Sequence, residues 1–200
     1  MLPYPKNPKI ISEKIFFLDW ENIKVDVIDL GTIRILEVYN VYLDFTNVRN
    51  FILETPCLKD DSHPGYLFKY GVQVHPIEKL LEQLLSEYLN INLEVKMPFI
   101  GSVTTTKSVF PLSKSFAHKD GSGKPGIAGV VYLNDHTEVS GGTDFFINDK
   151  CIHTTKMEPN KMVLYPQNLV HSGNIPENSF DDVWRITQNI FIDNRSDKRI

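Results

Sequence analysis

The sequence predicts a mainly β fold, either a sandwich or a barrel, with supporting helices in the N-terminal half. From residue 91 onward, short runs rich in β-branched and aromatic residues alternate with turn signals, which is typical of sandwiches and barrels. Residues 76–89 carry an apolar stripe with helical spacing, which predicts one long helix. No internal repeat or low-complexity segment interrupts these patterns, so we expect a single domain spanning residues 1–200.

The first predicted elements are a hairpin and a short helix. Residues 23–30 and 33–39 alternate around a glycine, which predicts two paired strands. Asp44 or Thr46 is a suitable N-cap for a helix over residues 47–54, because either side chain can accept a hydrogen bond from a free backbone N–H.

A polar segment precedes the long helix. Residues 57–66 contain Pro64-Gly65 and predict a connecting loop. Pro76 suits the first turn of the long helix, whose apolar stripe would cover one face of a sheet. The strands expected after that helix are residues 93–97, 100–109, 126–134, 143–148, 161–165, 170–171 and 184–193.

The composition excludes several classes of protein. The net charge of −4 and the pI near 5.9 argue against a protein that mainly neutralises phosphates, so nucleic acid is not an expected partner. No apolar run approaches the length that crosses a bilayer, and the N-terminus has no signal-peptide pattern, so we expect a cytoplasmic protein without membrane contact. Two cysteines without metal or redox spacing agree with a reducing compartment. Lys150, Lys156 and Lys161 are close in sequence and indicate a solvated face, with a local basic groove as the alternative.

His118 and Asp120 form the most informative local pattern. In an extended strand, side chains two positions apart point the same way, so this imidazole and this carboxylate face the same side. His171 ends an apolar run further along the chain and is the natural candidate for a third ligand. Two imidazoles and one carboxylate are the ligand set of non-haem Fe(II) oxygenases, which leave the opposite face of the metal open.

A second segment contains the same chemical types. His136-Thr137-Glu138 lies in a polar stretch that predicts a turn between two strands. Because a flexible turn holds ligands poorly, we expect His136 not to bind the metal.

The last predicted strand has one apolar and one polar side. Alternation places Arg185 and Thr187 on the polar side, opposite a mostly apolar row. One interpretation is a polar outer face in water. The other is that Arg185 and Thr187 face a barrel interior, where an arginine can bind a carboxylate through two hydrogen bonds.

Six sequence elements follow one another in a characteristic order. They are His118-x-Asp120, Val131-Tyr132-Leu133-Asn134, Ser140-Gly141-Gly142-Thr143-Asp144-Phe145, Pro159 with Met162-Val163-Leu164-Tyr165, His171-Ser172-Gly173 and Arg185-x-Thr187. Over about residues 35–193 this order resembles the 2-oxoglutarate and Fe(II)-dependent oxygenases, most closely their prolyl 4-hydroxylase-like branch. Residues 47–51 and 63–65 also resemble a less characterised group of bacterial and viral members of that superfamily.

The resemblance implies a fold and a set of site residues. The implied fold is a double-stranded β-helix, a cupin-like jelly roll, over about residues 99–193, supported by the strands and helices of about residues 1–98. The implied iron ligands are His118, Asp120 and His171, and the residues implied for the distal carboxylate of 2-oxoglutarate are Arg185, Thr187 and Tyr132.

The implied activity is hydroxylation of a substrate at the expense of O₂ and 2-oxoglutarate. The substrate stays open between a peptide side chain, a free amino acid and a small metabolite. One alternative is a non-catalytic β-helix that serves as a binding or assembly module. Another is a metal enzyme on the same scaffold that uses no 2-oxoglutarate, and Arg185 with Thr187 is the feature that separates it from the first hypothesis.

Overall fold

The structure is a computed structural model that describes residues 13–54, 58–59, 66–73, 75–104, 117–120, 126–135, 141–175, 180 and 184–193. Its helices are η1 (Glu13–Phe16), α1 (Phe45–Glu54) and α2 (His75–Leu89). Its strands are β1 (Lys24–Asp29), β2 (Arg34–Tyr39), β3 (Leu58–Lys59), β4 (Tyr66–Gln73), β5 (Pro98–Thr104), β6 (Gly126–Tyr132), β7 (Thr143–Ile147), β8 (Lys150–Thr155), β9 (Lys161–Pro166), β10 (Val170–Gly173) and β11 (Arg185–Asp193).

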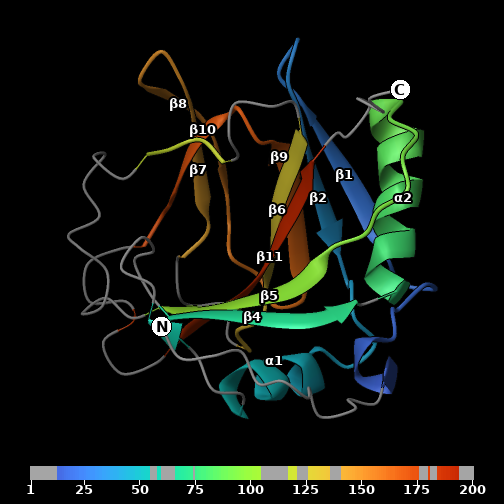
Figure 1. Ribbon diagram of the computed structural model, residues 1–200. Helices are drawn as coiled ribbons and strands as arrows, with labels where there is room; N and C mark the ends of the chain where they lie inside the picture. The colour runs from blue at the N-terminus through green and yellow to red at the C-terminus, as the bar shows by residue number, and fades with distance from the viewer. Residues whose placement is uncertain are drawn as a thin grey trace, which may run out of the picture.

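The strands form two antiparallel sheets. The large sheet has eight strands in the order β1-β2-β9-β6-β11-β5-β4-β3, and the small sheet has three in the order β10-β7-β8. An isolated antiparallel bridge between His118 and His171 adds residues 117–120 to the free side of β10. The helices lie on the far side of the large sheet, α2 beside β1 and β2 and α1 below β4 and β5 (Figure 1).

The chain crosses between the two sheets in the order of a jelly roll. It leaves β5 in the large sheet, contributes residues 117–120 beside the small sheet, and returns to the large sheet as β6. It then forms β7 and β8 in the small sheet, β9 in the large one, β10 in the small one and β11 in the large one. The fold predicted for this part of the chain is therefore confirmed: a mainly β jelly roll, or double-stranded β-helix, with supporting helices.

Strand alternation separates two cores. On β9, Met162 and Leu164 pack with the helices in the larger apolar cluster, whereas Val163 and Tyr165 point between the sheets into the smaller one. The same alternation continues across neighbouring strands of the large sheet. Residues of β9 and β11 that face away from the helices consequently line the interior of the jelly roll, which is where the candidate site lies.

The two predicted helices form close to the expected positions. The stripe of α2 is fully buried at Ile77, Leu81 and Leu85, as the periodicity predicts. Helix α1 begins at Phe45, two positions before the expected start. Asp44 is its cap, because its carboxylate accepts a hydrogen bond from the backbone N–H of Asn47 at 3.1 Å.

The expected strand at residues 93–97 is wrong. This segment pairs with no strand among the described residues. Its backbone instead donates hydrogen bonds to α2: the N–H of Val95 to Glu82 Oε1 at 3.0 Å and the N–H of Met97 to Glu78 Oε1 at 2.9 Å. Acidic side chains of a helix therefore satisfy donors that the sequence pattern assigned to a sheet.

Three strands, β3, β4 and β8, were not predicted from the sequence, and β3 lies inside the predicted loop of residues 57–66. Strand β8 pairs with β7 through a two-residue turn at Asn148 and Asp149, both of which have positive φ angles, 49° and 61°. A turn of this kind favours Asn and Asp, so the dipeptide was an available hairpin signal. Strand β4 pairs with β5, and it begins where the predicted loop ends.

Two further expectations concern charge and membranes. Lys150 and Lys156 are exposed as predicted, but Lys161 is only 2% exposed and lies inside the jelly roll, so its assignment to a solvated face was wrong. Within the described part of the chain, no helix has both the length and the hydropathy needed to span a membrane.

Candidate metal centre

Backbone pairing fixes the segment that carries His118 and Asp120. The N–H and C=O of His118 both bond to the backbone of His171 at 2.9 Å, and the N–H of Asp120 donates to the carbonyl oxygen of Gln167 at 2.9 Å. These bonds hold the segment extended beside β10. His118 and Asp120 therefore point to the same side, as their spacing predicts.

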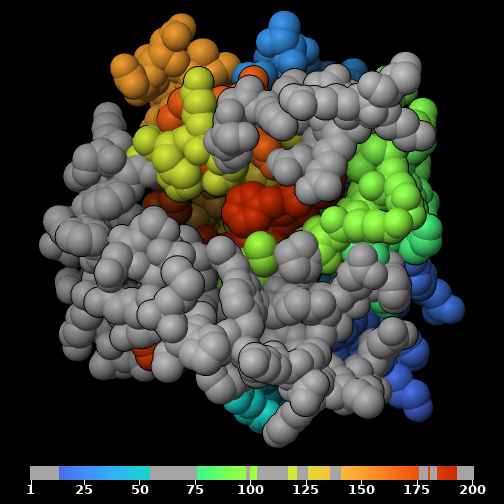
Figure 2. All heavy atoms as spheres, viewed as in Figure 1, coloured from blue at the N-terminus to red at the C-terminus, as the bar shows by residue number. Residues whose placement is uncertain are grey.

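His118, Asp120 and His171 form one group in which a ligand atom of each lies within 4.8 Å of the others. His118 Nε2 lies 3.6 Å from Asp120 Oδ1, and His171 Nε2 lies 3.3 Å from Asp120 Oδ2. Asp120 and His171 are largely buried, whereas the side chain of His118 is 60% exposed. The group thus lies at the rim of the jelly roll with one side open to solvent. The yellow-green atoms of residues 117–120 and the red atoms of β11 reach the same face of the molecule (Figure 2).

The surroundings of the group favour an ionised carboxylate and a defined histidine tautomer. Burial alone would raise the pKa of Asp120, but the hydrogen bonds and charges of His118 and His171 outweigh it and hold that pKa well below its usual range. The Nδ1 atom of His171 lies 3.0 Å from the carbonyl oxygen of Leu169. Because a carbonyl only accepts, Nδ1 carries a proton there, and Nε2 is the ring nitrogen that faces the carboxylate.

Tyr165 adds a third polar contact to Asp120. It lies on β9, and its hydroxyl donates to Asp120 Oδ2 at 3.3 Å. Burial and the charge of Asp120 raise the pKa of Tyr165, so its hydroxyl stays protonated. The sequence analysis assigned this residue no role. Alternation along β9 was an available signal, since Lys161, Val163 and Tyr165 share the inner face.

Arg185 lies in the same interior, on β11. It is 9% exposed, and its Nε donates to the carbonyl oxygen of Gly141 at 2.7 Å. Among the described residues it has no carboxylate partner, and burial lowers the pKa of its guanidinium. Of the two interpretations of the last strand, the interior one is therefore right for Arg185 and for Thr187, which is 2% exposed.

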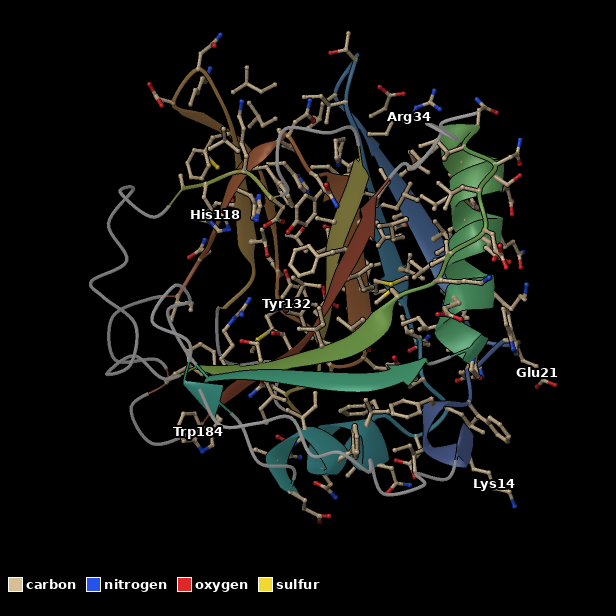
Figure 3. The ribbon with its side chains drawn as sticks, in the orientation of Figure 1. Lys14, Glu21, Arg34, His118, Tyr132 and Trp184 are labelled. Atoms are coloured by element: carbon tan, nitrogen blue, oxygen red, sulfur yellow. The ribbon has the colours of Figure 1, made fainter. Side chains whose placement is uncertain are left out.

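Tyr132 and a glycine turn complete the surroundings of Arg185. The guanidinium carbon lies 5.7 Å from the centre of the Tyr132 ring, and the Tyr132 hydroxyl is paired with Thr143 Oγ1 at 2.7 Å. Burial raises the pKa of Tyr132 to about 12. The ring lies between the two sheets (Figure 3). A Cβ at Gly142 would overlap the carbonyl oxygen of Thr155, which explains why this turn needs glycine.

Asn134 holds the strand that carries Arg185. Its Nδ2 donates to the carbonyl oxygen of Trp184 at 2.6 Å, and its Oδ1 accepts from the N–H of Ile186 at 2.9 Å. The two backbone groups flank Arg185 on either side. Asn134 thus sets the start of β11 and, with it, the direction in which the guanidinium leaves the backbone.

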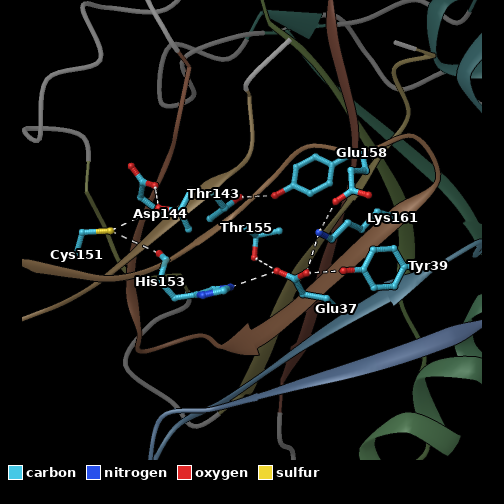
Figure 4. Close-up of polar contacts among 11 residues, drawn as sticks. Glu37, Tyr39, Thr143, Asp144, Cys151, His153, Thr155, Glu158 and Lys161 are labelled. Carbon is cyan, nitrogen blue, oxygen red and sulfur yellow. Dashed lines mark hydrogen bonds and ion pairs between the residues drawn. The ribbon is translucent and has the colours of Figure 1, made fainter. Parts of the chain in front are cut away.

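A second polar cluster lies deeper in the jelly roll. Glu37 on β2 accepts hydrogen bonds from Lys161 at 2.8 Å and from Thr155 at 2.7 Å, and its other neighbours are Tyr39 at 2.8 Å and His153 at 3.2 Å. Burial would raise the pKa of Glu37, but these partners, Lys161 first, lower it to about 2. We call these five residues the buried ion cluster (Figure 4).

His136, the alternative ligand in the predicted turn, lies outside the described residues. The same holds for most of the segment between β5 and residue 117.

Comparisons with known proteins give distant matches to solved structures and no match in sequence. Neither protein-family models nor curated protein sequences match the chain. A solved structure, described as the crystal structure of a Pseudomonas putida prolyl-4-hydroxylase, has 13% sequence identity and a TM-score of 0.42, covering 88% of this chain and 80% of that one. A match at this level is too distant to assign a function, so the assignment of the site depends on its own residues.

Proposed function

We propose that the protein is an Fe(II)- and 2-oxoglutarate-dependent oxygenase that hydroxylates a small-molecule or peptide substrate. The observation that carries the proposal is a buried cation, Arg185, that has no carboxylate partner among the described residues and lies in the same interior as a His–Asp–His group. Each feature alone has several explanations. Together they match an enzyme that binds a metal and a dicarboxylate side by side.

The donor set of His118, Asp120 and His171 fits a non-haem iron. Imidazole and carboxylate ligands in a two-to-one ratio suit Fe(II), and the exposed side of the group leaves room for further ligands. His171 also has the supporting contact that metal-binding imidazoles use, since its other ring nitrogen bonds to a backbone carbonyl. These three residues would hold the iron.

Arg185 would bind the carboxylate that points away from the metal. A buried guanidinium is costly unless an anion neutralises it, and a carboxylate matches its planar fork of N–H donors. The Tyr132 ring lies beside the guanidinium and its hydroxyl is held by Thr143, so that hydroxyl would serve as a second, oriented contact. Thr187 follows on the same face of β11 and would line the pocket.

Bound Fe(II), with O₂ and 2-oxoglutarate, supplies oxidation of a C–H bond coupled to decarboxylation of 2-oxoglutarate to succinate. The chain contributes binding, orientation and exclusion of water. Phe145 and Tyr165 pack against His171 with ring centres 6.4 and 4.6 Å away, which shields the inner side of the group from solvent. An arginine that anchors the far end of a dicarboxylate would direct its near end toward the metal ligands.

The proposal is tested by metal content and succinate release. Purified protein, loaded anaerobically with Fe(II) and then exposed to O₂ and 2-oxoglutarate without added substrate, should release succinate slowly, and Asp120→Ala should release none. If the parent and Arg185→Ala each bind one equivalent of metal but neither releases succinate, the metal enzyme that uses no 2-oxoglutarate is favoured. Absence of stoichiometric metal would favour the non-catalytic module.

A further inference from the structure

Asp120 is surrounded by three side-chain donors among the described residues. They are His118 Nε2 at 3.6 Å, His171 Nε2 at 3.3 Å and the Tyr165 hydroxyl at 3.3 Å. Two of these donors are themselves metal ligands in the proposed function. The third is a neutral hydroxyl that belongs to a different sheet.

Metal binding changes what these donors can do for the carboxylate. An imidazole that gives its Nε2 lone pair to a metal has no proton on that nitrogen, so it no longer donates a hydrogen bond to Asp120. A hydroxyl keeps its proton. Within the described part of the chain, Tyr165 is then the side chain that still donates to the carboxylate.

The position of Tyr165 is set by packing on several sides. Its ring meets Phe145 edge-on at 5.0 Å between centres and lies 4.6 Å from the His171 ring at an interplanar angle of 53°. Its backbone belongs to β9, which is paired on one side with β6 and on the other with β2. A buried, well-packed ring at the centre of the large sheet can hold its hydroxyl in one place.

We infer that Tyr165 is a positioning residue, which orients the Asp120 carboxylate through a hydrogen bond to Oδ2 so that the other oxygen is directed at the metal. The inference rests on the proposed function, because it assumes a metal held by His118, Asp120 and His171. It goes beyond that function in naming the residue of the opposite sheet on which the geometry of the carboxylate depends. Tyr165 acts through Asp120 and does not itself bind the metal.

The test is a Co(II) titration of Tyr165→Phe, which removes the hydroxyl and keeps the ring. Loss of an outer contact to a metal ligand lowers metal affinity by about 10- to 100-fold in other sites, and we expect a loss in that range. The visible absorption spectrum of bound Co(II) should also change, because the carboxylate reorients. A change in overall packing alone would not alter that spectrum.

Tyr42→Phe is the matched control. Tyr42 is also a fully buried tyrosine, and its hydroxyl bonds to Gln188 on the helix side of the large sheet, away from the metal ligands. Its loss should lower stability by a similar amount without changing Co(II) affinity or the spectrum. Unfolding midpoints of both metal-free variants show whether the stability losses are in fact comparable.

The outcomes separate this inference from the function on which it rests. If the parent binds Co(II) stoichiometrically and Tyr165→Phe matches Tyr42→Phe in affinity and spectrum, the inference is overturned and the proposed function stands. If the parent binds no metal, both are overturned. In an Asp120→Ala background, Tyr165→Phe should not weaken the remaining Co(II) binding further, and an undiminished effect there would contradict action through Asp120.

Discussion

Two polar clusters lie inside this jelly roll, and they differ in whether the described residues supply a Lys or Arg to neutralise the buried carboxylate. In the buried ion cluster, Glu37 has a cation, Lys161, at 2.8 Å, and that cation has a second carboxylate, Glu158, at 3.1 Å. In the metal-centre triad of His118, Asp120 and His171, the carboxylate faces two imidazoles and, among the described residues, no Lys or Arg. Both carboxylates have lowered pKa values, for different reasons.

From this difference we propose that the buried ion cluster is structural and that the triad is a functional site. A buried ion pair with additional hydrogen bonds needs nothing from outside, so it serves to hold strands together. A carboxylate beside two imidazoles, one of them exposed, has the composition of a metal-binding set, and among the described residues no Lys or Arg neutralises it. Arg185 shows the complementary case, a buried cation for which the described part of the chain supplies no anion. Judged by their lowered pKa values alone, Glu37 and Asp120 would be equally good candidates for a functional site.

The largest expected effect is on metal binding. Changing both His118 and His171 to Ala removes two of three ligands, so stoichiometric binding of Fe(II), Ni(II) or Zn(II) should be lost while the fold is kept. Metal analysis after gel filtration, with circular dichroism as a check of the fold, measures this. A double variant that still holds one equivalent of metal would show that the triad is not the site.

The next effect concerns Arg185 and is specific to the co-substrate. Truncating one partner of a buried charge pair costs about 2–5 kcal/mol, so Arg185→Ala should weaken 2-oxoglutarate binding by roughly 30-fold to several thousand-fold. Arg185→Lys keeps the charge without the planar fork and should be intermediate. Calorimetric titration of the Mn(II)-loaded protein gives both affinities. Parent-like binding by Arg185→Ala would mean that the carboxylate binds elsewhere.

The buried ion cluster should respond in stability and leave metal binding unchanged. Glu37→Gln leaves Lys161 with one carboxylate, Glu158, which is partly exposed, and should lower the free energy of unfolding by about 3 kcal/mol. Urea denaturation of the metal-free protein measures the loss. Metal affinity is measured under conditions in which the variant stays folded. A weaker metal affinity there would show that the buried ion cluster is not purely structural.

Acid should reduce the difference in free energy of unfolding between Glu37→Gln and the parent. The pKa of Glu37 is lowered from 4.5 to about 2 in the folded protein, so its ionised form stabilises the fold above pH 4.5. The contribution falls as the pH decreases from 4.5 toward 2. Denaturation of both proteins at pH 7 and pH 3 should therefore give a smaller difference at pH 3. An equal difference at both pH values would mean that the charge of Glu37 is not what stabilises the fold.

The smallest expected effect is none at all. His136→Ala should leave metal affinity and stoichiometry unchanged, because His136 belongs to a segment predicted as a polar turn. The measurement is the same metal titration as for the triad variants. A weaker affinity would add a ligand from that segment to the proposed centre.

Local periodicity determined much of this protein. The stripe of α2, the hairpin of β1 and β2, and the shared side of His118 and Asp120 all follow from side-chain direction in helices and strands, which neighbouring residues alone decide. The same alternation placed Arg185 and Thr187 on one side of the last strand. It did not decide which side faces inward, because both sides of a central strand can be covered.

Only the tertiary structure decided which distant side chains meet. Lys161 was assigned to a solvated face because scattered lysines are usually solvated, but β9 pairs with β2, and that pairing brings Glu37 to it. Residues 93–97 have the sequence pattern of a strand, but backbone N–H groups of this segment donate to Glu78 and Glu82 of α2 and not to a neighbouring strand. Tyr165 reaches Asp120 because the two sheets face each other. Strand order and the packing of sheets depend on contacts between segments far apart in sequence, which no local pattern records.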